Sequence, residues 1–126
     1  TEIVMPRLKS DLVELLLAVG NTTLQQHTIE IDERAAATVI VASGGYPEDY
    51  QKGKEITGLD KVEDSIAFHS GTKADGDKIL TNGGRVLAVT SYGNNIQEAV
   101  AKSNAAIEQI NFEGKYYRKD IGYEFK

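Results

Sequence analysis

Two short glycine-containing segments, 69–73 and 82–85, carry basic side chains that suit an anion site. Glycines let backbone N–H groups approach an anion, while Lys supplies charge and Arg offers a two-pronged donor to a phosphate or carboxylate. The candidate substrate-binding residues in these segments are His69, Lys73, Gly83, Gly84 and Arg85. The competing interpretation is a hairpin turn with ordinary surface cations, which short motifs of this kind favour.

The other candidate residues form no complete catalytic set. His69 has the chemistry of a general base, but a single His at the end of a strand is more often a hydrogen-bonded structural residue. The glycine turn at 43–47 matches neither the dinucleotide fingerprint nor the phosphate-loop pattern, so a structural turn is favoured. The Tyr and basic residues at 116–119 resemble a stacking patch, for which the acidic net charge favours an anchoring role. We therefore predict no catalytic residue.

Composition excludes several classes of function. The 126 residues include 14 basic and 19 acidic side chains, a net charge of -5 that argues against a nucleic-acid binder. The absence of cysteine removes disulfides, thiolate zinc sites and cysteine nucleophiles. Two histidines are too few for a histidine-rich metal site, and the acidic pairs lie in polar segments, so we predict no metal ligands. No apolar run is long enough to span a bilayer, and we expect a cytoplasmic protein that contacts no membrane.

The elements that must position these candidates follow from hydrophobic periodicity. Strands are expected at 1–5, 22–31, 36–42, 65–69, 78–81 and 85–91. The last two strands flank Asn82-Gly83-Gly84, which predicts a hairpin because glycine accepts positive φ. A polar surface excursion is expected at 48–62, and a strand or loop packed on the sheet at 112–126.

Two helices are expected, and they differ in what they need. Residues 95–110 carry one apolar stripe, and Asn95 followed by Glu98 fits a capped N-terminus. The other helix is expected to begin at Pro6 and to end at Gly20. Its apolar stripe consists of Leu8, Leu12, Leu15, Leu16 and Val19. Such a stripe needs a partner surface.

Five sequence blocks follow one another along nearly the whole chain, at residues 6–12, 42–47, 68–73, 81–87 and 112–122. Each block alone has little specificity, but five in register are highly specific. Together they resemble the C-terminal part of the glycinamide ribonucleotide synthetase family, also called phosphoribosylamine–glycine ligases. The resemblance implies an ATP-grasp ligase of de novo purine biosynthesis, which joins glycine to 5-phosphoribosylamine with ATP and magnesium (or manganese) through a glycyl phosphate.

The resemblance also implies a fold and a division of the chain. The fold is α+β, with the last strand and helix of an ATP-grasp domain at 1–21 and a C-terminal substrate-closing domain at 22–126. That domain is expected to be a small antiparallel, barrel-sandwich-related sheet with flanking helices. By analogy with related ATP-grasp enzymes, Arg85 holds the ribose 5-phosphate, supported by Lys73 and the backbone before Arg85.

In the family, the magnesium ligands, the nucleotide clamp and the glycine-binding domain precede the position of Thr1. We therefore expect this chain alone to be inactive and to bind no cofactor. Its expected partners are the missing N-terminal and ATP-grasp domains of the same polypeptide, together with small-molecule substrates.

A second interpretation stays open, a free-standing interaction or small-ligand module that uses the same domain without catalysis. The start without methionine and the leucine stripe without a partner favour the fragment. If the missing domains cover Leu12, Leu15, Leu16 or Val19, the chain is expected to self-associate through that helix face.

Overall fold

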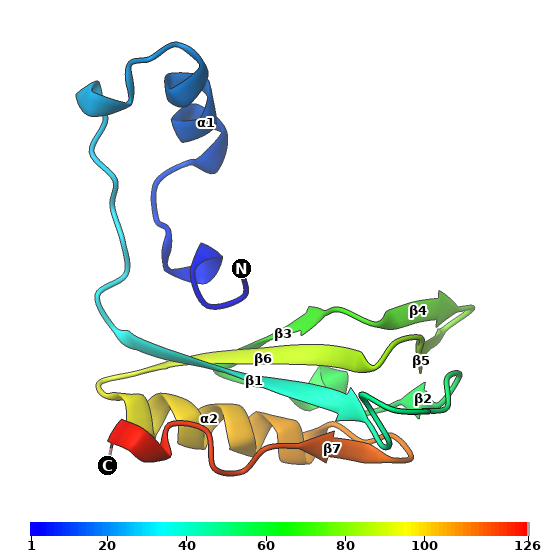
Figure 1. Cartoon of the computed structure of the whole chain (residues 1–126). Coiled ribbons are helices and arrows are strands. Elements are labelled where there is room, and N and C mark those ends of the chain that lie inside the picture. Colours follow the sequence, from blue (N-terminus) through cyan, green and yellow to red (C-terminus); the bar gives the residue numbers. More distant parts are fainter. Residues whose placement is uncertain (126) are drawn as a thin grey trace.

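The computed structural model describes residues 1–125, which form two antiparallel sheets, two α-helices and four short 3₁₀ helices (Figure 1). The elements in chain order are η1 (Met5–Arg7), α1 (Leu12–Gly20), η2 (Leu24–Gln26), β1 (Ala35–Ser43), β2 (Glu55–Ile56), η3 (Leu59–Lys61), β3 (Ser65–His69), β4 (Thr72–Asp75), β5 (Lys78–Thr81), β6 (Arg85–Gly93), α2 (Ile96–Gln109), β7 (Lys115–Tyr117) and η4 (Tyr123–Phe125). The expected α+β class is confirmed. The barrel-sandwich relationship and the ATP-grasp origin of the first helix stay predictions. No helix within residues 1–125 has the length and apolar character needed to cross a membrane.

The main layer is a four-stranded antiparallel sheet in the order β3-β6-β1-β7, with α2 packed across one face (Figure 1). β1 and β6 pair along most of their length, from Ala35 opposite Gly93 to Val41 opposite Leu87. Because side chains alternate along a strand, each of these strands presents an apolar face to α2. The resulting core consists of Val39, Val41, Ile56, Val86, Leu87, Val89, Ala106, Ile107, Ile110 and Phe112.

Helix α2 begins as its sequence predicts. The Asn95 side chain accepts a hydrogen bond from the Glu98 N–H at 2.8 Å. The Glu98 carboxylate accepts in return from the N–H of Asn94, one residue before the position used in a standard capping box, and this bond is the main cause of the lowered pKa of Glu98. Within the apolar stripe, the Ser103 hydroxyl donates to the Ala37 carbonyl at 3.1 Å, which satisfies a buried polar group.

The hairpin predicted around Asn82-Gly83-Gly84 is wrong. β5 pairs with β4 rather than with β6, and the hairpin turn lies at 75–78, where Gly76 has a φ of 59°. Residues 82–84 instead join the three-stranded sheet, in the order β2-β5-β4, to the four-stranded sheet. Neither Gly83 nor Gly84 has positive φ. Glycine at 83 favours close approach of the two segments, because a Cβ there would lie only 3.0 Å from the Cα of Gly71.

The start of the chain differs most from the expectation. The strand predicted at 1–5 is a turn that leads into η1, and the helix predicted from Pro6 begins only at Leu12. Pro6 lies instead near the start of η1, a three-residue helix, where its missing N–H costs nothing. Asp11 caps α1, its carboxylate accepting from the N–H of Glu14 at 3.0 Å. Between η1 and α1 the chain is extended, and Leu8 pairs with Ile31 of a later segment.

Residues 8–32 form an arm that projects from the sheet and carries α1 near its far end (Figure 1). The strand predicted at 22–31 is wrong, since this segment consists of η2 followed by extended chain with one isolated bridge, between Leu8 and Ile31. We call residues 8–32 the arm. The two extended sides of the arm pair with each other at this bridge, and neither side belongs to a sheet.

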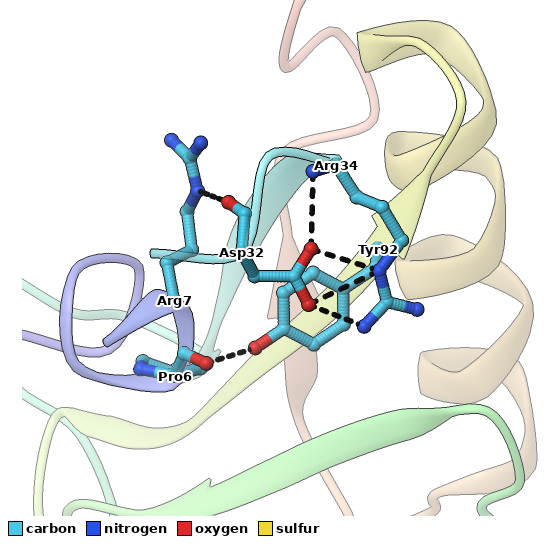
Figure 2. Close-up of polar contacts among 5 residues, drawn as sticks. All are labelled: Pro6, Arg7, Asp32, Arg34 and Tyr92. Carbon is cyan, nitrogen blue, oxygen red and sulfur yellow. Dashed lines mark hydrogen bonds and ion pairs between the residues drawn. The ribbon is translucent and has the colours of Figure 1, made fainter. Parts of the chain in front are cut away.

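Polar contacts among five residues join the base of the arm to β6 (Figure 2). We call these residues the latch: Pro6, Arg7, Asp32, Arg34 and Tyr92. The Asp32 carboxylate accepts from the Arg34 guanidinium, with a shortest N–O distance of 2.6 Å, and the Asp32 carbonyl accepts from Arg7 Nε at 2.9 Å. The hydrogen bonds from Arg34 lower the pKa of Asp32 to about 2. The Arg34 guanidinium lies 4.3 Å from the centre of the Tyr92 ring, whose hydroxyl donates to the Pro6 carbonyl.

Candidate functional site

The two glycine turns that the sequence singles out, one after β1 and one before β6, meet at a corner of the structure. The Ser43 N–H donates to the Gly84 carbonyl at 2.8 Å, and the Ser43 hydroxyl donates to the Gly83 carbonyl at 3.0 Å. The Tyr46 ring lies against Gly84, which is buried. Segments about 40 residues apart therefore build one corner.

A β-bulge beside this corner sets the direction of Arg85. On β6, Leu87 and Val89 belong to the core under α2, and simple alternation would place Arg85 on the same covered face. The register between β1 and β6 shifts after Val41, so that Ala42 lies opposite Arg85. The extra residue on β6 turns the Arg85 side chain to the other face of the sheet, which is a known use of bulges near functional sites.

On that face Arg85 borders a groove of about 280 Å³ between β1, β7 and the chain that follows β7. The residues that line it include Ile40, Ala42, Tyr46, Arg85, Tyr116 and Arg118. Three of the five sequence blocks, 42–47, 81–87 and 112–122, thus converge here. A groove with apolar walls and a cation at its edge suits a small ligand that carries one anionic group.

The two guanidinium groups at the groove differ in availability. Arg118 is held by Asp120 through two hydrogen bonds, of 2.9 Å and 2.7 Å, which raise the pKa of Arg118 and lower that of Asp120. Arg85 is exposed and forms no ion pair with any carboxylate of residues 1–125. Arg85 interacts with the Glu2 carboxylate only beyond ion-pair distance, so of the two guanidinium groups it is the one more available to an incoming anion.

His69 and Lys73 lie elsewhere, and neither side chain lines this groove. His69 ends β3, with its Nδ1 2.9 Å from the Thr72 hydroxyl, and Lys73 belongs to β4 in the other sheet. Only the backbone of this block reaches the corner, since a Cβ on Gly71 would lie 2.4 Å from the Arg85 carbonyl oxygen. The substrate-binding roles of His69 and Lys73 stay predictions.

Sequence reasoning did not assign the walls of the groove. Ile40 lies between Val39 and Val41, and the alternation of the strand was enough to place it on the face opposite the core. Tyr116 reaches the groove because it lies opposite Ala42 in the β1–β7 register. That register is a long-range pairing, and no local pattern reports it.

Residues 1–125 contain no group of three or more His, Cys, Asp or Glu side chains placed to hold a metal ion. Magnesium prefers oxygen ligands, chiefly carboxylates. The magnesium that the resemblance implies is given no ligands among these residues, and no step of the chemistry is assigned to a metal on this chain.

Comparisons with known proteins agree with the sequence resemblance. The family model described as "Phosphoribosylglycinamide synthetase, C domain" matches residues 36–124. A phosphoribosylamine–glycine ligase from Chlorobaculum tepidum is 46% identical over 125 residues, covering 97% of this chain and 29% of the relative. The ligase of the same name from Escherichia coli (strain K12) is 46% identical over 126 residues, covering 98% of this chain and 29% of the relative. The chain thus spans less than a third of the length of these relatives.

A solved structure shares the fold. The crystal structure of a phosphoribosylamine–glycine ligase from Thermotoga maritima matches with a TM-score of 0.67 and 35% sequence identity, over 85% of this chain and 27% of that chain. The matched family range contains β1 except its first residue, together with the corner, the groove and α2. These findings confirm the resemblance carried by the five sequence blocks, and the chain belongs to the phosphoribosylglycinamide synthetase C-domain family.

Proposed function

We propose that this chain is the C-terminal, substrate-closing part of an ATP-dependent ligase that joins glycine to phosphoribosylamine in purine biosynthesis, and that Arg85 binds the phosphate of the sugar. The observation that carries the proposal is the Arg85 guanidinium, which the bulge directs to the groove and which has no ion-pair partner among residues 1–125. A sugar phosphate matches this site, because it offers a dianion to the guanidinium and a compact body to the groove. The names of the C. tepidum and E. coli relatives supply the two substrates.

Other domains would complete the active site. The chain spans 29% of each of these relatives, and in the resembling family the metal ligands and the nucleotide clamp precede this region. We propose that ATP, magnesium and glycine are held by those domains, in a cytoplasmic enzyme, and that this chain alone neither catalyses the reaction nor binds a cofactor. The role left for this chain is to close one side of the site over the sugar phosphate.

The exposed side of α1 is the surface that we propose those domains cover. Leu15 and Ala18 are the buried residues of α1. Four apolar side chains, each between 56% and 65% exposed, are Val13, Leu16, Leu17 and Val19. Exposed apolar patches mark interaction sites, so the isolated chain should self-associate through this face. Sedimentation over a range of concentrations tests this, with Leu16→Glu as the control that restores the monomer, and a clean wild-type monomer at high concentration would contradict it.

A chimera tests the proposed ligase function directly. In the E. coli ligase, this chain replaces the segment that it matches at 46% identity, and ligation is measured with ATP, glycine and phosphoribosylamine. Activity of the chimera is the expected result. A folded chimera without activity would favour the alternative, a free-standing module that binds a small ligand without catalysis.

Arg85→Ala in the active chimera tests the site. Loss of a hydrogen bond from a charged group costs about 1.5–3 kcal/mol, so the KM for phosphoribosylamine should rise about 10- to 150-fold while the KM for glycine stays unchanged. Arg85→Lys should recover part of the loss, because it keeps the charge but not the two-pronged geometry. Arg118→Ala is the matched control with a smaller expected effect, since Asp120 already pairs with Arg118. An unchanged KM for the sugar in Arg85→Ala would overturn the assignment.

A further inference from the structure

We propose that Tyr46 is a positioning residue, whose ring holds the backbone at Gly84 and thereby fixes the Arg85 guanidinium at the groove. The inference rests on the proposed role of Arg85 and extends it to a residue in a different turn. Arg85 follows Gly84 directly in the chain. The placement of its guanidinium therefore depends on how firmly the backbone before it is held.

The contact between Tyr46 and Gly84 is close. A Cβ built on Gly84 would lie 2.0 Å from Cδ2, 2.4 Å from Cε2 and 2.9 Å from Cγ of the Tyr46 ring. The ring therefore occupies the space where a side chain at position 84 would stand, and only glycine fits beneath it. On another side, the ring centre lies 5.9 Å from that of Tyr50, with the planes at 66°.

The same turn also grips the corner through its backbone. Ser43 donates to the carbonyls of both Gly83 and Gly84, and the Tyr46 N–H donates to the Ser43 carbonyl at 3.1 Å. The ring and the Ser43 hydrogen bonds thus belong to one hydrogen-bonded turn at the end of β1. On the other side of the corner, the Asn82 N–H donates to the Gly71 carbonyl at 2.7 Å. The backbone before Arg85 is held from both sides, and the Tyr46 ring covers the glycine nearest to Arg85.

The Tyr46 side chain is 41% exposed, so it is not part of the buried core and can be changed without opening a cavity under α2. Its ring also lines the groove beside Arg85. A residue placed in this way should affect ligand binding more than folding. This difference separates positioning from a merely structural role.

The test is a double-mutant cycle in the active chimera, with the KM for phosphoribosylamine as the readout. Tyr46→Ala should raise this KM about tenfold or more and leave the KM for glycine unchanged, because only the sugar site loses its geometry. Tyr46→Phe, which keeps the ring, should stay within about twofold of the wild type. Gly84→Ala should match Tyr46→Ala, since the new methyl group must displace the ring.

The decisive variant combines both changes. If the ring acts through Gly84, Tyr46→Ala with Gly84→Ala should be no worse than either single change, because the methyl group then fills the space that the ring has left. Multiplying effects in the double variant would overturn the proposal. So would a Tyr46→Phe variant as impaired as Tyr46→Ala, because the hydroxyl and not the ring would then matter.

Controls separate this proposal from the proposed function. If Gly84→Ala fails to fold, recovery of folding on adding Tyr46→Ala supports the contact, and continued failure overturns it. An unchanged KM in Arg85→Ala would overturn the proposed function first. A raised KM in Arg85→Ala with a normal KM in Tyr46→Ala would overturn only the role of Tyr46.

Discussion

The two α-helices of this chain have opposite surroundings. α1 is the more apolar helix by sequence, yet it lies on the arm away from the sheet and buries only Leu15 and Ala18 (Figure 1). α2 carries charged and amide side chains among its 14 residues, yet Ala99, Ser103, Ala106 and Ile107 on its stripe are buried, and the helix packs on β1 and β6. Apolar content alone does not make a core. A helix is buried when a second surface of matching shape is present, and only α2 has such a surface among residues 1–125.

This difference predicts where the stability of the chain resides. The sheet and α2 hold a continuous core that includes Leu87, Ile107 and Ile110, all 0% exposed. The two extended sides of the arm are joined by one isolated bridge, and most of its large apolar residues are exposed. The sheets together with α2, which we call the sheet unit, should therefore unfold as one cooperative body. The arm should open locally, at a lower free energy than global unfolding.

The largest contrast should come from truncating an apolar side chain in each helix. Ile107→Ala removes a side chain from the middle of the core, and the free energy of unfolding should fall by about 2–5 kcal/mol. Leu16→Ala on the arm removes a side chain that is 60% exposed, and the change should stay within about 0.5 kcal/mol. Urea unfolding followed by circular dichroism measures both. Equal losses in the two variants would contradict the division into core and arm.

The two helix caps offer a smaller but better matched comparison. Asn95 accepts from the Glu98 N–H at 2.8 Å, and Asp11 accepts from the Glu14 N–H at 3.0 Å, so the two caps use the same geometry. Replacing a cap by Ala costs about 0.5–2 kcal/mol. In Asn95→Ala this loss should appear in global unfolding, because α2 is part of the core.

In Asp11→Ala the same loss should appear only as faster amide hydrogen exchange in α1, with global unfolding unchanged. Because the two caps have the same geometry, Asn95→Ala and Asp11→Ala should differ only in where the loss of stability appears. A global loss in Asp11→Ala would mean that the arm and the sheet unfold together.

Much of the sheet unit could be read from the sequence because its signals are local. The run of Val, Ile and Ala residues in β1 and the cap at Asn95 each act over a few residues, and both are confirmed. Arg85 could be named as a candidate from its type and its neighbouring glycines. Its direction could not, because the bulge after Val41 is a property of how β1 pairs with β6.

The incorrect predictions for the hairpin and for the first helix have one physical cause, which is pairing between segments far apart in the sequence. The glycines at 83 and 84 signal a tight backbone, but they do not say whether the flanking strands pair with each other or with β3 and β4. Pro6 is a sound helix-start signal, yet the bridge between Leu8 and Ile31 keeps the chain extended and delays the helix to Leu12. Local propensity is a weak prior wherever a distant segment supplies a competing partner.

The smallest and most local effect should come from the latch. Asp32 has a pKa of about 2, lowered from 3.8 first by the side-chain hydrogen bonds from Arg34 (Figure 2). Because the folded-state pKa is depressed, the stabilisation is fully present above about pH 4 and is lost as the pH falls towards 2. Protonating Asp32 weakens its hold on Arg34, which stacks on Tyr92 of β6.

Acid should therefore loosen the arm. Glu98 and Glu108 of the sheet unit, and Asp120 after β7, also have lowered pKa values, so a variant compared above pH 4 is needed to isolate the latch. The carboxyl carbon of Asp32, followed by NMR, should titrate with a midpoint near 2 in the wild type. In Arg34→Ala the midpoint should rise but stay below 3.8, because the N–H of residue 34 still donates to the carboxylate. In Asp32→Asn, the backbone amides of residues 8–32 should exchange hydrogen faster than in the wild type even above pH 4, and the amides of α2 should exchange at the wild-type rate. A wild-type midpoint near 3.8 would show that Arg34 does not hold the Asp32 carboxylate in solution. Faster exchange in α2 would instead mean that the latch supports the sheet as well, and the contrast between arm and sheet would fail at the point where they join.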